Sequence, residues 1–163
     1  SELNALSRLV GKLGEVAQVL AIGGSHGHQI GMQRVRAAVV EGGARWIHDG
    51  MAHEAHAGRV SPPSGPESAP LADGDVRVLC AHNPRIWKTS RDAGYHLVLA
   101  GHLHGCQLVA WEHRGRLFPG GFFYRYCFSR RRHGSTRLVV SRGVSDLVPI
   151  RWRCPREVVL CHV

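Results

Sequence analysis

The chain has 163 residues, enough for one domain with a hydrophobic core, and its 44% hydrophobic content is ordinary for a globular protein. No stretch approaches the roughly 18 to 20 consecutive apolar residues of a membrane-spanning helix, and the chain does not start with basic residues followed by an apolar run. The formal net charge of +9 favours an anionic partner, such as a phosphate ester, a nucleic acid or an acidic membrane surface, without choosing among them.

The first part of the chain alternates between helix and strand patterns. Apolar residues recur at helical spacing over 3–13 and again over 32–41, and glycines follow both segments. Residues 19–22 and 45–47 are short apolar runs that predict buried strands. This order of elements predicts an α/β layered fold.

A proline-rich segment interrupts this pattern over residues 52–74. Its prolines are interleaved with serine, glycine and alanine, which predicts a flexible loop. Regular patterns return with a predicted strand over 76–81 and a predicted helix over 84–93, which begins with a proline as a first helical turn allows. A further strand is predicted over 96–100.

Beyond residue 105 the sequence consists of short β-type runs separated by glycine, proline and charged turns. The second half is therefore predicted to be mostly β, within a single domain over residues 1–163. The predicted strands are 107–111, 122–128, 137–140, 148–152 and 157–161.

The five cysteines are odd in number and widely spaced, and no two of them form a C-x-x-C pair. We expect neither a structural zinc site nor a disulfide framework, but buried free thiols in a reducing compartment. A cytoplasmic location follows as an expectation. A segment preceding Ser1 would change that expectation to a membrane-associated or exported protein.

The densest basic run is Arg130 to His133, with Arg125 and several aromatic residues nearby. This pattern predicts a solvated hairpin tip flanked by core aromatics. Nucleic-acid binding is the alternative interpretation. No recognised nucleic-acid motif supports it, so it ranks last.

Histidine is unusually common, with twelve in the chain, and two of them lie in the sequence Gly-His-Leu-His-Gly over 101–105. His102 and His104 directly follow the apolar run 97–100, at the strand end where open α/β sheets usually bind ligands. On an extended backbone their side chains point the same way. An H-x-H pattern alone is weak evidence for a metal site, because two solvent-exposed histidines without a metal can have the same spacing.

Two other predicted strands also end in histidines. The strand over 76–81 ends in His82, and the strand over 19–22 is followed by a glycine-rich segment that contains His26. If the strands before His82 and His102 are parallel neighbours, both imidazoles arrive at one edge of the sheet. Neutral imidazoles gathered in this way suit a transition-metal site.

With these motifs the sequence resembles the calcineurin-like metallophosphoesterases. Members of that family carry D-x-H, G-D-x-x-D, G-N-H-D, a lone metal-binding His and G-H-x-H in this order. Counterparts of the last three lie at 24–27, 79–84 and 101–105. The tail over 140–155 is similar to a membrane-associated or lipid-directed branch of the family.

The resemblance implies a part of the family's layered α-β-β-α sandwich and, for the whole family, two divalent transition-metal ions, of Mn, Fe or Zn. It implies that His82 and His102 bind one ion and that His104 binds the other. His26 would lie beside the transferring phosphoryl group, and Ser25 would be a weak metal or phosphate contact.

The chain also departs from the family pattern. Ser25 stands where the family has the metal-binding asparagine, Gly27 stands where it has the orienting aspartate, and the D-x-H and G-D-x-x-D motifs have no counterpart. We therefore expect at most one ion. We also expect either a fragment or a degenerate relative.

The predicted function is a metal-dependent phosphoric ester hydrolase, acting on a phosphomonoester or phosphodiester and impaired in this isolated chain. The alternative is a non-catalytic relative that binds a metal ion or phosphate. The expected partner is a phosphate-ester substrate, with association at a membrane surface and self-association through an unsatisfied sheet edge as further expectations. We expect no nucleic-acid partner.

Overall fold

The computed structural model describes residues 2–25, 31–56, 59–61, 73–146 and 148–162. It divides the chain into two compact units, Ser1–Met51 and Ala52–Val163, each with hydrophobic clusters of its own. The predicted α/β class with a mostly β second half is confirmed. The single domain stays a prediction, because compact units need not be separate domains.

The first unit packs two helices, α1 (Glu2–Gly14) and α3 (Met32–Glu41), beside a pair of parallel strands, β1 (Leu20–Ile22) and β2 (Arg45–Ile47). The predictions for these elements are confirmed to within two residues. Apolar residues at helical spacing form the core of this unit, because they place one side of each helix against its neighbours. The buried residues of this core are Val10, Val39 and Ala44.

Gly42 allows the two helices to approach closely. A Cβ atom at this position would lie 2.5 Å from the backbone oxygen of Ser7 and 2.8 Å from the Cβ of Val10. Only a residue without a side chain fits this space. Gly42 therefore both ends α3 and sets the helix spacing.

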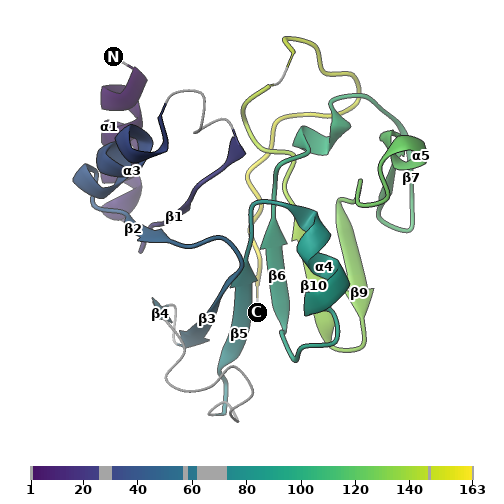
Figure 1. The fold of residues 1–163 in the computed structure, drawn as a ribbon, viewed down its shortest axis with the longest axis horizontal. Coiled ribbons are helices and arrows are strands. Elements are labelled where there is room, and N and C mark those ends of the chain that lie inside the picture. The colour runs from purple at the N-terminus through teal and green to yellow at the C-terminus, as the bar shows by residue number, and fades with distance from the viewer. Residues whose placement is uncertain (1, 26–30, 57–58, 62–72, 147, 163) are drawn as a thin grey trace. The chain divides into compact units, whose positions relative to one another are not determined.

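The second unit is built on a sheet with strand order β4-β3-β5-β6-β10-β9 (Figure 1). β6 lies between β5 and β10 and is parallel to both, whereas β9 pairs with β10 in the antiparallel direction. The strands are β3 (Met51–His56), β4 (Arg59–Ser61), β5 (Val76–Cys80), β6 (Leu97–Ala100), β9 (Arg130–His133) and β10 (Thr136–Val140).

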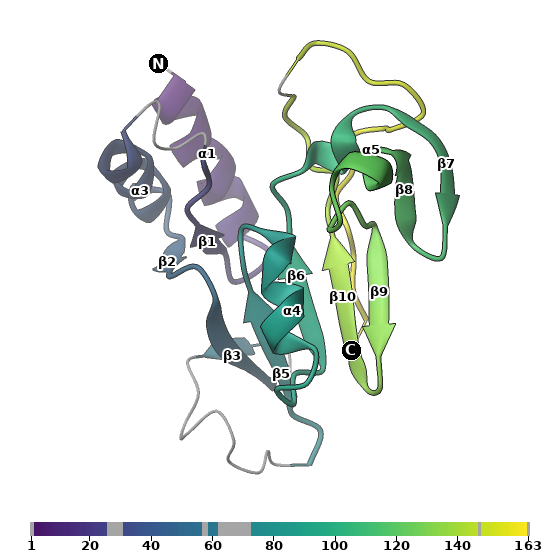
Figure 2. The same cartoon turned by 45° about the vertical axis from the view of Figure 1, so that its right-hand side comes forward.

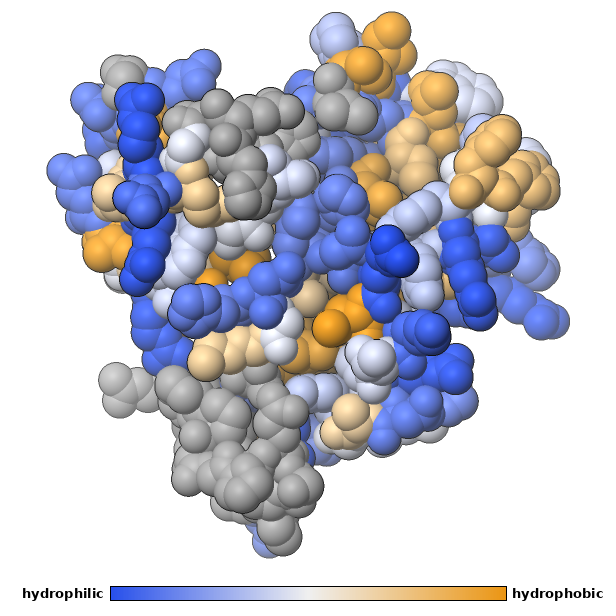
Figure 3. Space-filling view, in the orientation of Figure 1, coloured by the Kyte–Doolittle hydropathy of each residue, from blue (hydrophilic) through white to orange (hydrophobic). Residues whose placement is uncertain are grey.

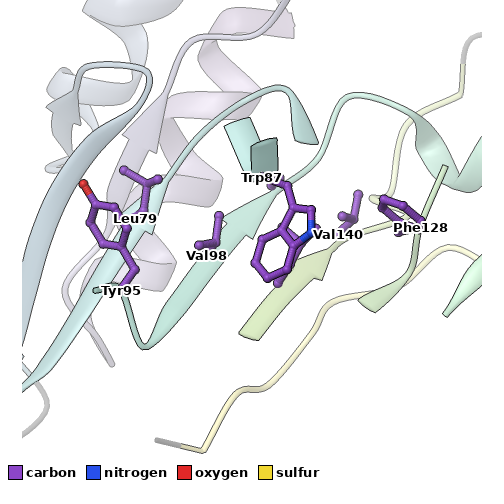
Figure 4. Close-up of a cluster of buried hydrophobic side chains, with 8 residues drawn as sticks. Leu79, Trp87, Tyr95, Val98, Phe128 and Val140 are labelled. Carbon is purple, nitrogen blue, oxygen red and sulfur yellow. The ribbon is translucent and has the colours of Figure 1, made fainter. Parts of the chain in front are cut away.

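Two short helical turns connect β5 to β6, a 3₁₀ turn over Pro84–Ile86 and α4 (Trp87–Ser90). α4 packs over one face of the parallel strands (Figure 2), as a crossover connection between parallel strands requires. Trp87 lies over this face near Val98 and Val140 (Figure 4). The helix predicted over 84–93 is real but shorter than expected, because residues 91–94 form a turn.

A smaller module follows β6. The strands β7 (Val109–His113) and β8 (Arg116–Pro119) form an antiparallel hairpin, and α5 (Gly120–Phe123) follows directly. A disulfide joins Cys106 to Cys127 at the base of this module. The expectation of free thiols alone is therefore wrong for this pair, because spacing along the chain gave no sign that they meet in space.

Several predicted strands are not strands in the structure. Residues 122–128 form the end of α5 and a turn, with one isolated bridge from Phe128. Residues 148–152 contribute only a bridge from Trp152, and 157–161 form no ladder. Apolar content alone suggested strands here, but in the described residues the pairing of these segments goes no further than single bridges to Arg116 and Leu108.

The segment 52–74, predicted as a loop, contributes to two strands. Residues 52–56 belong to β3 and residues 59–61 form β4, and the two pair as an antiparallel hairpin. The proline-rich residues 62–72 lie outside the described residues. The loop prediction is thus wrong for the residues that pair in this hairpin.

The basic run Arg130 to His133 forms the edge strand β9 and not a hairpin tip. The tip consists of Gly134 and Ser135, after which the chain returns as β10. All four β9 residues are exposed, in agreement with the predicted solvation of this charge. Charged side chains on an edge strand also discourage pairing with another chain at that edge.

Substitution of Leu138 tests the core beneath α4. Leu138 is 1% exposed and belongs to the main cluster, so Leu138→Ala should lower the free energy of unfolding in urea by about 2 to 5 kcal/mol. Ile150→Ala is the control, since Ile150 is 63% exposed and should change the value by less than about 0.5 kcal/mol. Equal effects of the two substitutions would contradict this description of the core.

Candidate functional site

His82 and His102 lie at the ends of the neighbouring parallel strands β5 and β6. The strands stay paired up to the histidines, since the Ala81 amide donates to the Leu99 carbonyl at 2.9 Å and the Gly101 amide donates to the His82 carbonyl at 3.1 Å. The parallel arrangement predicted for these two strand ends is confirmed. It brings both imidazoles to one edge of the sheet.

The two rings meet through their nitrogen atoms. His102 Nδ1 lies 2.9 Å from His82 Nε2, the ring centroids are 4.7 Å apart, and the ring planes are inclined by 67°. In this contact one nitrogen carries the hydrogen and the other accepts it. Two ring nitrogens therefore point at one small volume at the end of β5 and β6.

The loop after β6 is not extended. His102, His104 and Gly105 have φ angles of 75°, 50° and 65°, all in the left-handed region. The expectation that His102 and His104 point the same way rested on an extended backbone, and that premise is wrong. The two side chains have different partners in the structure.

Gly105 is required by its surroundings as well as by its φ angle. A Cβ atom there would lie 2.5 Å from Cys154 Sγ and 2.9 Å from Arg142 Cγ. The Cys154 thiol is buried against this turn and donates to the His104 and Gly105 carbonyls at 3.4 and 3.6 Å. The histidine loop is thus packed tightly against the C-terminal segment.

His104 is oriented by a backbone oxygen. Its Nδ1 lies 2.8 Å from the Ser145 carbonyl oxygen. Because a carbonyl oxygen only accepts, Nδ1 carries the hydrogen and Nε2 of the neutral ring has the lone pair. A hydrogen bond of this kind is the usual way in which a metal-binding histidine is oriented.

The loop that supplies Ser145 is held by Arg151. This guanidinium, 10% exposed, donates to the Ser145 carbonyl at 2.7 Å and to the Arg142 carbonyl at 2.9 Å, and it pairs with Asp146. It also donates to the Cys154 and Pro155 carbonyls. One largely buried guanidinium therefore holds together the loop that orients His104.

Gln107 fixes the far end of the same loop. Its side-chain amide donates to the Val148 and Ile150 carbonyls at 2.6 and 3.0 Å, and its side-chain oxygen accepts from the Val148 amide at 3.1 Å. Gln107 is buried and has a φ angle of 56°. No pattern in the sequence predicts this clamp, although Arg151 lies in the tail segment that contributes to the family resemblance.

Other polar groups near the histidines serve structural roles. Asn83 Oδ1 accepts from the Arg85 amide at 3.0 Å, which caps the turn after β5, and from the Tyr124 hydroxyl at 3.3 Å. Burial raises the pKa of the Cys80 thiol, so this residue stays protonated at neutral pH.

The structure does not test the predicted contribution of the segment after β1 to the site. Ser25 is exposed after β1 in the first unit, and His26 lies outside the described residues. Within the described parts of the chain, no three His, Cys, Asp or Glu residues are close enough to hold a metal ion together. The structure thus brings His82 and His102 together, and it does not add His104 to them as a third ligand of one ion.

The comparisons with known proteins give one partial likeness. Over 108 residues, 66% of this chain, the sequence is 31% identical to Phosphodiesterase YaeI from Escherichia coli (strain K12). The match covers 37% of that protein, so the chain spans little more than a third of its relative. No protein-family model and no solved structure matches the chain. The likeness supports a resemblance to phosphoesterases.

None of the helices in the described part of the chain has the length and the apolar composition of a membrane-spanning segment.

The Arg151 and Asp146 pair predicts how stability depends on pH. Hydrogen bonds from Arg151 and then Arg156 hold the pKa of Asp146 below its ordinary value. The stabilisation is present above the unfolded-state pKa of about 3.9 and is lost as the pH falls through the lower folded-state pKa. Asp146→Asn should therefore lower the urea midpoint at pH 6, and the difference from the parent should shrink toward strongly acidic pH.

The matched control for this experiment is Asp92→Asn. Asp92 contacts Arg91 and His133 at the surface, where an ion pair contributes at most about 1 kcal/mol. A constant difference between parent and Asp146→Asn at every pH would show that the carboxylate charge is not what stabilises the loop.

Proposed function

We propose that the chain carries the histidine part of a metal-dependent phosphoric ester hydrolase site, and that this site is impaired when the chain acts alone. One observation carries the proposal: His82 Nε2 and His102 Nδ1 converge to 2.9 Å at the ends of two neighbouring parallel strands. Ligands in open α/β sheets bind at this edge.

The separation of the two nitrogens fits one transition-metal ion. With metal–nitrogen bonds of about 2.0 to 2.1 Å, two imidazole ligands at angles between 90° and the tetrahedral value lie about 2.8 to 3.4 Å apart. The observed 2.9 Å falls at the short end of this range. Without a metal, the same two nitrogens share a hydrogen.

His104 would offer Nε2, since its Nδ1 is committed to Ser145. The tautomer and ring orientation follow from the loop that Arg151 and Gln107 hold, so these two residues support the site from outside it. The family resemblance also assigns His26 and Ser25 to the phosphoryl group. For these two residues the proposal rests on the family resemblance alone.

The proposed hydrolysis of a phosphate ester agrees with the name of the similar protein from Escherichia coli. Phosphodiesterase YaeI is 31% identical over 108 residues, and a phosphodiester is the substrate class we propose here. A bound transition metal supplies a polarised phosphoryl oxygen and a water of lowered pKa. Nitrogen-rich sites favour Zn, Mn or Fe over Mg, and two converging imidazoles with no described carboxylate suit one weakly bound ion.

Metal binding tests the histidine pair directly. After loading with zinc and dialysis, the parent should hold at most one ion per chain, and His82→Ala/His102→Ala should lose it because both converging nitrogens are gone. The matched control is His113→Ala/His162→Ala, which removes two exposed histidines from other places. Elemental analysis measures the metal. Equal metal in the parent and the His82→Ala/His102→Ala variant, or two ions in the parent, would refute the assignment.

Catalysis is expected only when the missing ligands are supplied. The chain alone should not hydrolyse bis-p-nitrophenyl phosphate above background with manganese, since losing even one preorganised contact typically costs about 100-fold in rate. A chimera that adds a segment bearing D-x-H and G-D-x-x-D before residue 1 should gain activity, and His102→Ala should abolish it.

Two results of the catalytic assay would count against the proposal. Robust metal-dependent hydrolysis by the unmodified chain would mean that other residues replace the missing ligands. A folded chimera that binds two ions but stays inert would favour a non-catalytic binding protein.

A further inference from the structure

A basic groove lies between the β7–β8 turn and the β9–β10 hairpin. Its cavity volume is about 560 Å³, and five arginines line it. Among the described residues of its lining, Glu112 is the one carboxylate. The groove therefore holds an excess of positive charge, which favours an anionic ligand. The lining arginines are Arg114, Arg130, Arg131, Arg132 and Arg137. The side chain of Arg131 faces the other side of β9, with its guanidinium over the Phe128 ring, so the charge of the groove comes from the other four.

The strand register places like charges together. Arg132 lies directly opposite Arg137 in the antiparallel pair, so their side chains share one face of the sheet. Arg130 is two residues from Arg132 and lies on that face as well. Like charges directly opposite each other destabilise a sheet, and a locally unfavourable choice of this kind is typical of functional sites.

Protection of the sheet edge does not explain the whole cluster. Charged residues on β9 would discourage edge pairing, but Arg137 lies on β10, between β6 and β9. Arg114 lies in the turn between β7 and β8, outside this sheet. Arginines from β9, β10 and the β7–β8 turn thus line one groove.

The arginines are available to a ligand. Arg130 is 81% exposed and its contact with Glu112 is long, at 3.9 Å. Hydrophilic side chains also gather near β9 on the side of the sheet that α4 covers (Figure 3). At the groove, Arg114, Arg132 and Arg137 are exposed too. Each guanidinium presents a planar fork of donors that matches the oxygens of a phosphate.

We propose that this groove binds the phosphate backbone of a single-stranded nucleic acid. Alternate residues of a strand are about 6.6 Å apart, so Arg130 and Arg132 form a row of cations that suits a linear row of phosphates. The exposed rings of Phe122 and Phe123 in the same unit offer faces on which bases stack. No motif in the sequence supports nucleic-acid binding. The groove is the structural observation that favours it.

A flat bilayer fits these features less well. The site is a groove, and Trp111 and Glu112 are successive residues of β7, so they face opposite sides of the hairpin. Trp111 pairs with Phe118 and stacks on it with the aromatic cluster, whereas Glu112 lines the groove. A flexible strand can reach both sides of the hairpin, and a planar surface cannot.

The proposal does not depend on phosphoester hydrolysis or on metal. It is tested with the full chain and a short fluorescein-labelled oligothymidylate, by fluorescence anisotropy at salt concentrations up to about 200 mM. The groove variant is Arg114→Gln/Arg132→Gln/Arg137→Gln. The matched control is Arg8→Gln/Arg34→Gln/Arg36→Gln, which removes the same charge from exposed positions in the first unit.

The groove variant should bind at least about tenfold more weakly, and the slope of log K against log salt should decrease in magnitude by about 2. The control variant should lose less than about threefold in affinity. Should the triple variant fail to fold, as judged by circular dichroism, Arg132→Glu alone should still weaken binding because Arg132 is exposed on the edge strand.

Three results would overturn the proposal. These are no binding of the oligonucleotide by the parent chain, equal losses in the groove and control variants, and binding to phosphatidylserine-containing vesicles without binding to the oligonucleotide. The last result would assign the basic surface to an anionic membrane.

Discussion

The parallel pairing of β5 with β6 is the constraint on which the candidate site depends. The pairing continues beyond the strand ends, where the Gly101 amide donates to the His82 carbonyl. It therefore brings together His82 and His102, which are distant from each other in the sequence. The short α4 makes this pairing possible, because it returns the chain to the start of β6 and covers the same face with Trp87. Core packing and site geometry therefore have a common origin.

The remaining geometry comes from the C-terminal segment, which forms no ladder over most of its length. Arg151, Gln107 and Cys154 replace the missing ladder with side-chain bonds to backbone carbonyls. Such bonds satisfy buried peptide groups in irregular structure as a ladder does in a sheet. An irregular segment can thus position His104 as firmly as a strand could.

The sequence predicted the elements whose patterns are local. The helices α1 and α3, the strands β5 and β6, and the meeting of His82 with His102 followed from periodicity and strand order. It did not predict the Arg130 to His133 strand, the Cys106–Cys127 disulfide or the left-handed backbone at His102, because each depends on contacts between distant segments. The clamp by Gln107 had no local signal at all.

The Ser145 carbonyl contacts both His104 and Arg151, and this sharing has an evolutionary consequence. A backbone oxygen cannot be substituted, so selection on the imidazole's orientation acts on the residues that place the oxygen. Changes in the segment 142–156 would then be as constrained as changes in the histidines, although Ser145 contributes no side-chain chemistry. Among relatives, the spacing between the histidine loop and Arg151 should vary less than the identity of the residues between them.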